Sequence, residues 1–447
     1  MSQDHLNNLQ FSFLYLIKKQ SNEDMDDLIS PYTFKHYIYF WIGQLFSLLG
    51  SQIISFVIIF WITIETGSAI LLSIATVLTF LPIVVFSPIA GVFADRWNRK
   101  IVIFFADFLQ AITTFALVII FFFNILNVWL VIFFTSLRSV FQAFHQPAAN
   151  AIIPLMVPKD KLSRINGINY LFTGLISTIG PIIGASLLLF LTIDQTLWID
   201  IITFLIAIIP LLLIKIPSIP KETEKEEKDS FIKDFRIGVN FIKSIPGLLA
   251  LLIFGSLFNF FIRPYTTLIT YYVTIYHLGS LTDLAIVMAS IQGSIFIGAV
   301  IVTIKKEWKR KIPIIVFGTF FPYIGIIIAS LAPLSNYLMI SIGTFIFAFT
   351  FPIINTIIIT IMQTTIPPDK QGRILSISIS IASVASPIGM FISGPLAELL
   401  GIVFLFILSS ILGIILIILV WFFSNIRKLE DSKISEQNNN NKINNKS

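Results

Sequence analysis

Long apolar runs constrain this chain more than any other feature of its sequence, because they recur almost without a break from residue 34 to residue 423. The core of a bilayer is about 30 Å thick and takes roughly 20 apolar residues per helical span. Since 56% of the residues are apolar and 12% are charged, the chain lacks the polar surface that a water-soluble globule needs. The runs are continuous rather than alternating, which favours helices over an outer-membrane β-barrel. The sequence therefore predicts an all-α membrane protein.

Twelve candidate spans can be placed in these runs, and the lysine and arginine residues fall on one side of them. The spans are 34–64, 69–94, 101–123, 128–152, 165–191, 197–214, 248–276, 284–304, 314–331, 337–362, 374–397 and 402–423. Loops on one side hold 28 of the 30 lysine and arginine residues, and the other two, Arg138 and Arg263, lie inside spans. By the positive-inside rule that side is cytoplasmic, so we expect a multi-pass protein of the cell membrane with both termini in the cytoplasm.

The longest interruption divides the spans six and six. We expect a cytoplasmic N-terminal segment at 1–33, a six-helix bundle at 34–215, a cytoplasmic linker at 216–245, a second six-helix bundle at 246–424 and a disordered cytoplasmic tail at 425–447. In the linker, Phe231, Phe235, Val239 and Ile242 recur near helical spacing, which predicts an amphipathic helix on the membrane surface. The alternative is a simple tether between the two bundles.

The two halves of the chain repeat each other in parallel. Trp97-Asn98-Arg99-Lys100-Ile101 returns as Trp308-Lys309-Arg310-Lys311-Ile312, and Pro147-Ala148-Ala149-Asn150 returns as Pro352-Ile353-Ile354-Asn355, in the same order and on the same side. Parallel six-span repeats, related by an axis along the membrane normal, are a transporter arrangement. A substrate is therefore expected to bind near the midplane, between the halves.

One cytoplasmic loop carries a family resemblance. Gly91-x-x-x-Asp95-Arg96-x-x-Arg99-Lys100, after span two, resembles the signature loop of the major facilitator superfamily. Within that superfamily, Arg138-Ser139 and Pro387-Ile388-Gly389 resemble the bacterial macrolide efflux proteins. The resemblance implies the major facilitator fold, with twelve transmembrane helices in two parallel-repeat six-helix bundles, and a drug exporter driven by the proton gradient.

Export of bulky hydrophobic, macrolide-like compounds by alternating access is thus the leading hypothesis. The alternative is export of an anionic metabolite such as a siderophore, because Arg138 and Arg263 supply positive charge inside the membrane. The chain has no Gly-x-x-x-x-Gly-Lys-Ser/Thr phosphate cradle, so it carries no ATPase of its own. Its cytoplasmic loops hold no acid–base or nucleophile constellation that would indicate an enzyme. The expected partners are the lipid bilayer, a hydrophobic small molecule and protons, with no nucleic acid, and we expect a monomer.

No cofactor or metal site is expected. The chain has no cysteine, which excludes disulfides, thiolate metal sites and iron–sulfur clusters. Its four histidines, His5, His36, His145 and His277, are scattered along the sequence, and no metal-binding spacing links them.

The signature loop provides a candidate cytoplasmic gate. Its residues are Gly91, Asp95, Arg96, Arg99 and Lys100. A helix that ends at Ala94 presents orphan carbonyls and the next begins near Lys100 with orphan amides, so the loop charges Asp95 and Arg99 could latch one half to the other. The alternative is that the cations only set topology. The second copy of the loop, at 305–311, keeps the cations but lacks the Gly and the Asp, which predicts a one-sided latch.

Ionisable residues inside spans are costly and usually functional. Arg138 in span four either faces the central cavity, where it takes part in coupling or substrate contact, or pairs with Asp107 or Asp200. At 1.5 Å per residue, His145 lies at about the same depth as Asp107, which makes that pair geometrically easier than Arg138 with Asp107. The proton-coupling candidates are therefore Asp107, Asp200, Arg138 and His145.

Polar residues form matching stripes on spans one and seven. The stripes are Gln44, Ser47, Ser51 and Ser55 in span one and, at an offset of 212 residues, Ser256, Asn259, Arg263 and Thr267 in span seven. A polar stripe in hydrocarbon needs water, a partner helix or a ligand beside it. Symmetric stripes favour a shared substrate cavity, to which Arg138 also belongs, over ordinary helix packing. They predict that Arg263 stands opposite Ser51.

Span five holds Gly174, Gly180, Pro181 and Gly184, which resemble part of the antiporter motif, although Ile176 stands where the full pattern has another glycine. Glycines let helices approach each other closely and proline adds a bend. The resemblance implies export rather than import. The alternative is that these small residues serve a tight helix pair.

Overall fold

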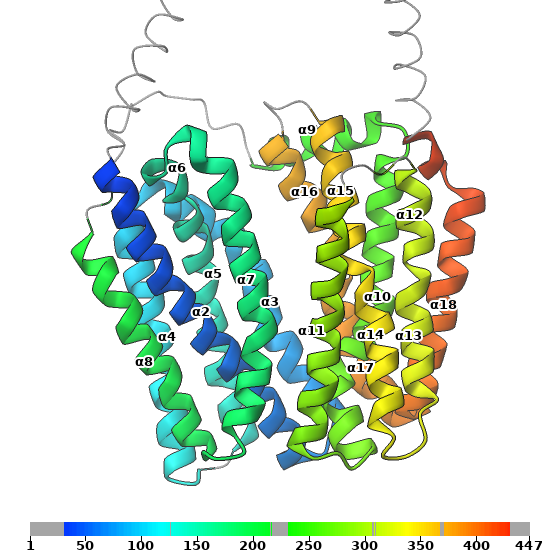
Figure 1. Cartoon of the computed structure of the whole chain (residues 1–447), viewed down its shortest axis with the longest axis horizontal. Coiled ribbons are helices and arrows are strands. Elements are labelled where there is room, and N and C mark those ends of the chain that lie inside the picture. The colour runs from blue at the N-terminus through cyan, green and yellow to red at the C-terminus, as the bar shows by residue number, and fades with distance from the viewer. Residues whose placement is uncertain are drawn as a thin grey trace, which may run out of the picture. The chain divides into compact units, whose positions relative to one another are not determined.

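The structure is a computed structural model that describes residues 31–125, 127–214, 216, 231–305, 308, 310–366 and 371–429. Within these ranges the chain forms helices joined by turns, and no strand occurs there (Figure 1). The predicted N-terminal segment up to residue 30, the charged first part of the linker and the tail after residue 429 lie outside the described residues.

The helices follow the predicted spans closely. In the first half they are α2 (Pro31–Thr66), α3 (Ala69–Arg96), α4 (Arg99–Phe122), α5 (Val128–Asn150), α6 (Ile153–Met156), α7 (Lys159–Leu187), α8 (Ile193–Leu213) and α9 (Phe231–Ser244). In the second half they are α10 (Leu248–Tyr271), η1 (Tyr272–Tyr276), α11 (Leu281–Ile304), α12 (Lys311–Gly318), α13 (Phe320–Ser330), α14 (Tyr337–Phe349), α15 (Phe351–Thr365), α16 (Gln371–Ser383), α17 (Ser386–Leu400), α18 (Ile402–Phe423) and η3 (Asn425–Arg427). The described part holds twelve helical segments long and apolar enough to cross a membrane, which confirms the twelve predicted spans.

Three spans of the second half consist of two helices each, namely α12 with α13, α14 with α15, and α16 with α17. Pro352 and Pro387 stand in the first turns of α15 and α17. A proline lacks a backbone N–H and clashes with the carbonyl four residues before it, so it is tolerated where a helix begins and breaks one that would continue through it. These two interruptions therefore have a local cause in the sequence.

The described chain forms two compact units that differ from the two halves of the sequence. The first unit comprises Met1–Ser55, Leu81–Gly180 and Leu191–Glu222, and the second comprises Phe56–Phe80, Pro181–Phe190 and Thr223–Ser447, as far as these ranges are described. The connection between α2 and α3 thus packs with the helices of the second half.

In the first unit, α4 lies between α5 and α8 (Figure 1). Helix α2 approaches α8 at two glycines. A Cβ atom on Gly43 would lie 3.2 Å from the Cα atom of Ala207, and one on Gly50 would lie 3.0 Å from the Cα atom of Asp200. Because glycine has no side chain, the two backbones can come this close. The polar residue after Gly50, Ser51, is thereby brought beside Asp200.

In the second unit, α10 is the central helix and packs against α16, α17 and α18. The segment between α2 and α3 is fixed here by Glu398 of α17, whose Oε1 atom accepts hydrogen bonds from Ser68 Oγ at 2.9 Å and from the backbone N–H of Ile70 at 3.2 Å. The carboxylate therefore lies at the N-terminus of α3, where the helix dipole favours negative charge.

Candidate functional site

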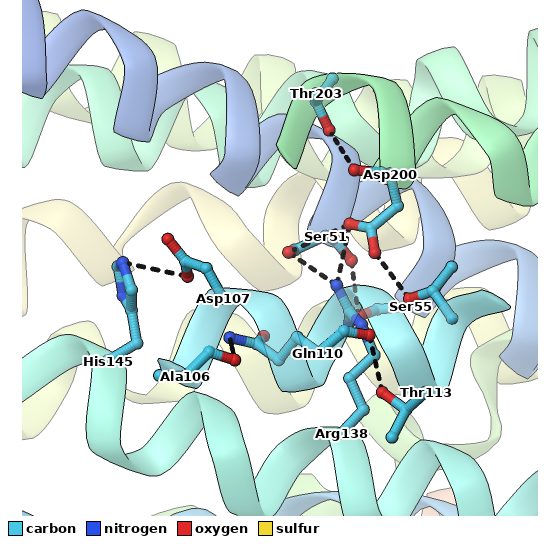
Figure 2. Close-up of polar contacts among 11 residues, drawn as sticks. Ser51, Ser55, Ala106, Asp107, Gln110, Thr113, Arg138, His145, Asp200 and Thr203 are labelled. Carbon is cyan, nitrogen blue, oxygen red and sulfur yellow. Dashed lines mark hydrogen bonds and ion pairs between the residues drawn. The ribbon is translucent and has the colours of Figure 1, made fainter. Parts of the chain in front are cut away.

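The first buried charge pair joins α5 to α8. Arg138 Nη2 lies 2.9 Å from Asp200 Oδ1, and both side chains are about 95% buried, with 5% and 6% exposed. The same nitrogen donates to Ser51 Oγ at 2.7 Å (Figure 2), while Thr114 Oγ1 of α4 donates to Asp200 Oδ2 at 2.7 Å. Four helices thus converge on one ion pair. A buried pair is tolerated when hydrogen bonds satisfy its remaining atoms, and here both carboxylate oxygens are satisfied.

The second pair joins α4 to α5. His145 Nε2 lies 3.5 Å from Asp107 Oδ1 and 2.6 Å from Gln44 Oε1 of α2, and Figure 2 shows the imidazole pointing at the carboxylate. An amide oxygen only accepts hydrogen bonds, so Nε2 carries the proton of the contact with Gln44. Of the two carboxylates predicted as possible partners of Arg138, Asp200 is the one that pairs with it. Asp107 lies beside His145 instead.

The polar residues of α2 and α4 that contact the first pair lie on the same helix faces as those of the second pair. Asp107, Gln110 and Thr114 follow one another at helical spacing on α4, as Gln44, Ser47 and Ser51 do on α2. Seven residues along a helix correspond to about 10 Å. The two pairs are therefore stacked at different depths in the first unit, and Asp107 lies nearer the lysine- and arginine-rich side.

A pocket opens beside the second pair. It encloses about 730 Å³ of empty space, part of which is open to solvent. Its lining includes the aromatic side chains of Tyr37, Phe40 and Trp41, the amides of Gln44, Gln110, Gln142, Gln146, Asn150 and Asn169, and the side chains of Ser47, Ser51, Asp107 and His145. The wall is held in place by Trp41, whose Nε1 donates to Asn169 Oδ1 at 2.9 Å. All of these residues belong to the first unit.

Three of the four residues of the stripe on span one line this pocket. Gln44, Ser47 and Ser51 line the pocket, whereas Ser55 donates to the backbone carbonyl of Ser51 at 2.8 Å and is not among the lining residues. Sequence reasoning missed Thr114 and the amides of Gln110 and Gln142. Thr114 could have been found from its spacing of seven residues from Asp107, which places both on one helix face.

The stripe on span seven has different surroundings. Asn259 Nδ2 donates to the backbone carbonyls of Gly255 and of Ala382, which lies in the last turn of α16. Arg263 Nη2 donates to Ser386 Oγ at 3.2 Å, and its guanidinium lies 5.8 Å from the ring centre of Phe80. The other two members, Ser256 and Thr267, are buried. The two hydrogen bonds that this stripe makes to other helices therefore reach Ala382 of α16 and Ser386 of α17.

The signature loop is shorter than predicted, because α3 continues to Arg96 instead of ending at Ala94. Gly91, Asp95 and Arg96 therefore lie in the last turns of α3, and their side-chain contacts lie outside the described residues. Asn98 caps α4 by accepting from the backbone N–H of Lys100 at 3.0 Å.

Lys100 and Arg99 follow that cap. Lys100 Nζ donates to the carbonyls of Leu212 at 2.7 Å and Ile214 at 2.8 Å, so this cation caps the C-terminal end of α8 within the first unit. Arg99 Nε has no hydrogen-bond partner among the described residues. The latch between halves stays a prediction.

The small residues of span five lie in α7. Gly180 packs against Gln52 of α2, and Gly184 is buried. Gly174 faces open space, with nothing within 4 Å of a Cβ atom placed there. Pro181 lies inside the helix. Close approach of α7 to α2 is therefore provided by Gly180.

The fold and this site together define a class of protein. Twelve apolar helices would bury the chain in a bilayer, and a pocket with ionisable groups within such helices is typical of proteins that pass a solute across the membrane. Among the described residues, no group of three or more histidine, aspartate and glutamate side chains is arranged to hold a metal ion. The class is that of membrane transporters.

The comparisons identify the family. The profile of the Major Facilitator Superfamily matches residues 40–378, and the chain belongs to this family. It is 31% identical over 390 residues to Macrolide efflux protein A of Streptococcus pyogenes, covering 87% of this chain and 96% of that protein. It is 30% identical to Macrolide efflux protein A of Enterococcus faecalis over 72% of this chain and 100% of that protein.

Solved structures support the same fold. A crystal structure of the nucleoside transporter NupG superposes with a TM-score of 0.65 at 13% identity, over 87% of this chain and 99% of that one. A bacterial homologue of the iron transporter ferroportin, solved in an inward-facing state, gives a TM-score of 0.64 at 14% identity, over 86% and 98%. At these identities the likeness concerns the fold alone.

Proposed function

We propose that this chain exports bulky hydrophobic, macrolide-like compounds across the cell membrane in exchange for protons. The relatives named as macrolide efflux proteins support the direction and the substrate class. So does a more distant relative, the multidrug efflux pump Tap of Mycolicibacterium fortuitum, at 24% identity over 83% of this chain. The single observation that carries the proton exchange is the buried carboxylate of Asp107 beside His145, on the wall of an open pocket.

The charge balance of the two buried pairs supports proton exchange. Arg138 and Asp200 cancel each other, so Asp107 leaves one negative charge when His145 is neutral. A proton on either member of the Asp107–His145 pair brings the balance to zero. Uncompensated charge is costly in an apolar surrounding, and therefore the site should be occupied by a proton or by a cationic substrate. If a proton and the substrate occupy the site alternately, the movement of protons in one direction is coupled to the movement of the substrate in the other.

The pocket chemistry fits compounds of the macrolide type. Macrolides combine an apolar ring with hydroxyl and carbonyl groups, and many carry a basic amine. Tyr37, Phe40 and Trp41 offer aromatic surface for the apolar part, while the six amides both donate and accept hydrogen bonds. Ligand sites of this kind are largely apolar, with a few polar groups that fix the ligand's orientation.

The orientation follows from the charged loops. The pocket lies toward the lysine- and arginine-rich ends of α2, α4, α5 and α7, which the positive-inside rule assigns to the cytoplasm. On this proposal both termini are cytoplasmic, the compound enters from the cytoplasm, and the monomer alternates between inward and outward access. The gate at Gly91, Asp95, Arg96, Arg99 and Lys100 would control the cytoplasmic side.

Replacing Asp107 with Asn tests the proposal. In a macrolide-sensitive host, the wild-type chain should lower accumulation of macrolides, and a protonophore should abolish this effect. Asp107→Asn keeps the size and hydrogen-bonding capacity but removes the titrating group, so proton-driven export should fall about tenfold or more, as expected for losing roughly 1.4 kcal/mol of coupling.

Asp194→Asn, in the first turn of α8 and outside the pocket, is the matched control and should export normally. Unchanged accumulation of every compound in a macrolide-containing panel, with folded wild-type protein in the membrane, would overturn the proposal.

Export of an anionic metabolite is the second candidate, because Arg263 forms no ion pair with any carboxylate whose side chain is described. An unpaired guanidinium attracts carboxylate or phosphate groups. In everted vesicles, anion uptake that Arg263→Gln abolishes would favour this candidate, whereas macrolide uptake that this substitution leaves intact would favour the first.

A further inference from the structure

A second cavity lies on the face of α2 that points away from the pocket. It is an apolar groove between α2 and α8 with about 870 Å³ of empty space, including its open side. Its walls include Tyr39, Ile42 and Phe46 on α2 and Ile206 and Ile209 on α8. These five side chains are between 42% and 58% exposed, so the described chain leaves the groove uncovered. In a bilayer, this surface faces lipid.

The groove has one charged end. His36 lines it at the start of α2, and the neighbouring Lys35 places Nζ 5.9 Å from the ring centre of Tyr39, a groove residue. At the end of α8, Lys100 Nζ lies 2.8 Å from the carbonyl oxygen of Ile214, which also lines the groove. Neither lysine forms an ion pair with a carboxylate whose side chain is described. The two lysines therefore bring positive charge to this end of the groove, where no described carboxylate pairs with them.

The length of the groove matches one leaflet. From His36 to Phe46 is ten residues, or about 15 Å along a helix, which equals half of a bilayer core about 30 Å thick. The charged end would then stand at the level of the headgroups and the apolar end near the midplane. This end belongs to the side that the positive-inside rule assigns to the cytoplasm, where anionic lipids attract lysine side chains near the surface.

We infer that the groove is a binding site for an anionic phospholipid of the cytoplasmic leaflet. One acyl chain lies against Ile42, Phe46, Ile206 and Ile209, and the headgroup phosphate meets Lys35 and His36. The apolar walls exclude a soluble anion as the main occupant, because they would gain nothing from it. The bound lipid spans the seam of α2 and α8 where Gly43 meets Ala207, and so supports the helix that carries the pocket on its other face.

Lipid retention by the full-length chain tests this inference. The protein is reconstituted in nanodiscs of phosphatidylcholine mixed with phosphatidylglycerol of the same chain length, released, and analysed by native mass spectrometry. Phosphatidylglycerol should be retained in preference to phosphatidylcholine. Lys35→Gln should lower its retention about fivefold, since one lysine near an anionic surface contributes about 1 kcal/mol. Lys305→Gln is the matched control, because Lys305 also stands over an aromatic ring, that of Trp308 in the second unit, and should change nothing.

Filling the groove provides the second arm. Ile206→Trp should remove the retained lipid, whereas Ile324→Trp, at an isoleucine of the second unit with 42% exposure against 43% for Ile206, should leave it. Should Ile206→Trp fail to fold, the headgroup arm still decides. Equal retention of the two lipids, or equal loss in Lys35→Gln and Lys305→Gln, would each overturn the inference.

Discussion

The two units surround their membrane-embedded arginines differently. In the first unit, Arg138 is paired with Asp200 and surrounded by hydroxyl groups from Ser51 and Thr114. In the second unit, the described contacts of the Arg263 guanidinium are the hydroxyl of Ser386 and the ring of Phe80. The repeat has thus preserved the helices and a polar stripe, but not the carboxylates. Among the described residues, the buried carboxylates, Asp107 and Asp200, therefore both lie in the first unit.

Because of this difference, removing Arg138 and removing Arg263 should have different consequences. Arg138 is part of a balanced network, in which removing one partner leaves a buried charge exposed to an apolar surrounding. Arg263 has no balancing partner among the described residues, so its removal leaves only neutral groups behind. The same substitution at the two arginines should therefore have unequal effects on stability.

Arg138→Met should have the largest effect. It leaves Asp200 buried without its cation, which costs about 3–5 kcal/mol, enough to lower both the folded yield and the thermal midpoint of the purified protein. The double variant Arg138→Met with Asp200→Asn removes both charges and should recover most of the loss. A double variant no more stable than the single one would show that the pair does not act as a pair.

The sequence predicts the twelve helices well, but it predicts less well which side chains pair with each other between helices. Long apolar runs specify the twelve helices because nothing else satisfies a backbone in lipid. Helical depth, counted along the sequence alone, also pairs Asp107 with His145. The partner of Arg138 stays open in the sequence, since Asp107 and Asp200 both qualify. The close packing of α2 against α8 at Gly50 brings Ser51 beside Asp200, the partner of Arg138. Packing between helices that are distant in the sequence leaves no periodic pattern from which it could be predicted.

The stripe on span seven shows the same limit. Its spacing matches that of span one, but the contact of Asn259 with the Ala382 carbonyl depends on the break between α16 and α17. Pro387 signals that break, yet the sequence does not indicate which helix lies beside it. The gate residues Asp95 and Arg96 and the relation of Arg263 to Ser51 remain predictions.

His145→Gln should have the next largest effect, and on transport rather than on folding. Glutamine can still hydrogen-bond Gln44, but unlike an imidazole it cannot place a positive charge beside the Asp107 carboxylate. The dependence of macrolide transport on pH in vesicles should shift or flatten accordingly. His277→Gln is the control, because His277 lies in the second unit beyond η1, outside the pocket. Equal pH profiles for wild type and His145→Gln would remove this pair from the coupling.

Gly43 and Gly255 are equivalent by the offset of 212 residues, and alanine substitutions there should differ by a smaller amount in stability. An alanine gains about 0.5–1 kcal/mol over glycine within a helix when its methyl group is unopposed. A Cβ atom at Gly255 meets only Ala382 Cβ at 4.0 Å, whereas at Gly43 it meets Ala207 Cα at 3.2 Å and Pro210 Cγ at 3.3 Å. Gly255→Ala should therefore be more stable than Gly43→Ala by about 1 kcal/mol, measured as thermal midpoints in one detergent. The reverse order would mean that α2 and α8 separate more easily than their packing indicates.

Arg263→Met should have the smallest effect on stability. It forfeits the hydrogen bond to Ser386 and the contact with the Phe80 ring, each worth about 1 kcal/mol. It also removes the cost of holding an unpaired guanidinium away from water, so the two contributions oppose each other. The thermal midpoint should therefore change by the equivalent of less than about 1 kcal/mol, against about 3–5 kcal/mol for Arg138→Met. A loss as large as that of Arg138→Met would mean that Arg263 has an anionic partner after all, and the contrast between the two arginines would no longer hold.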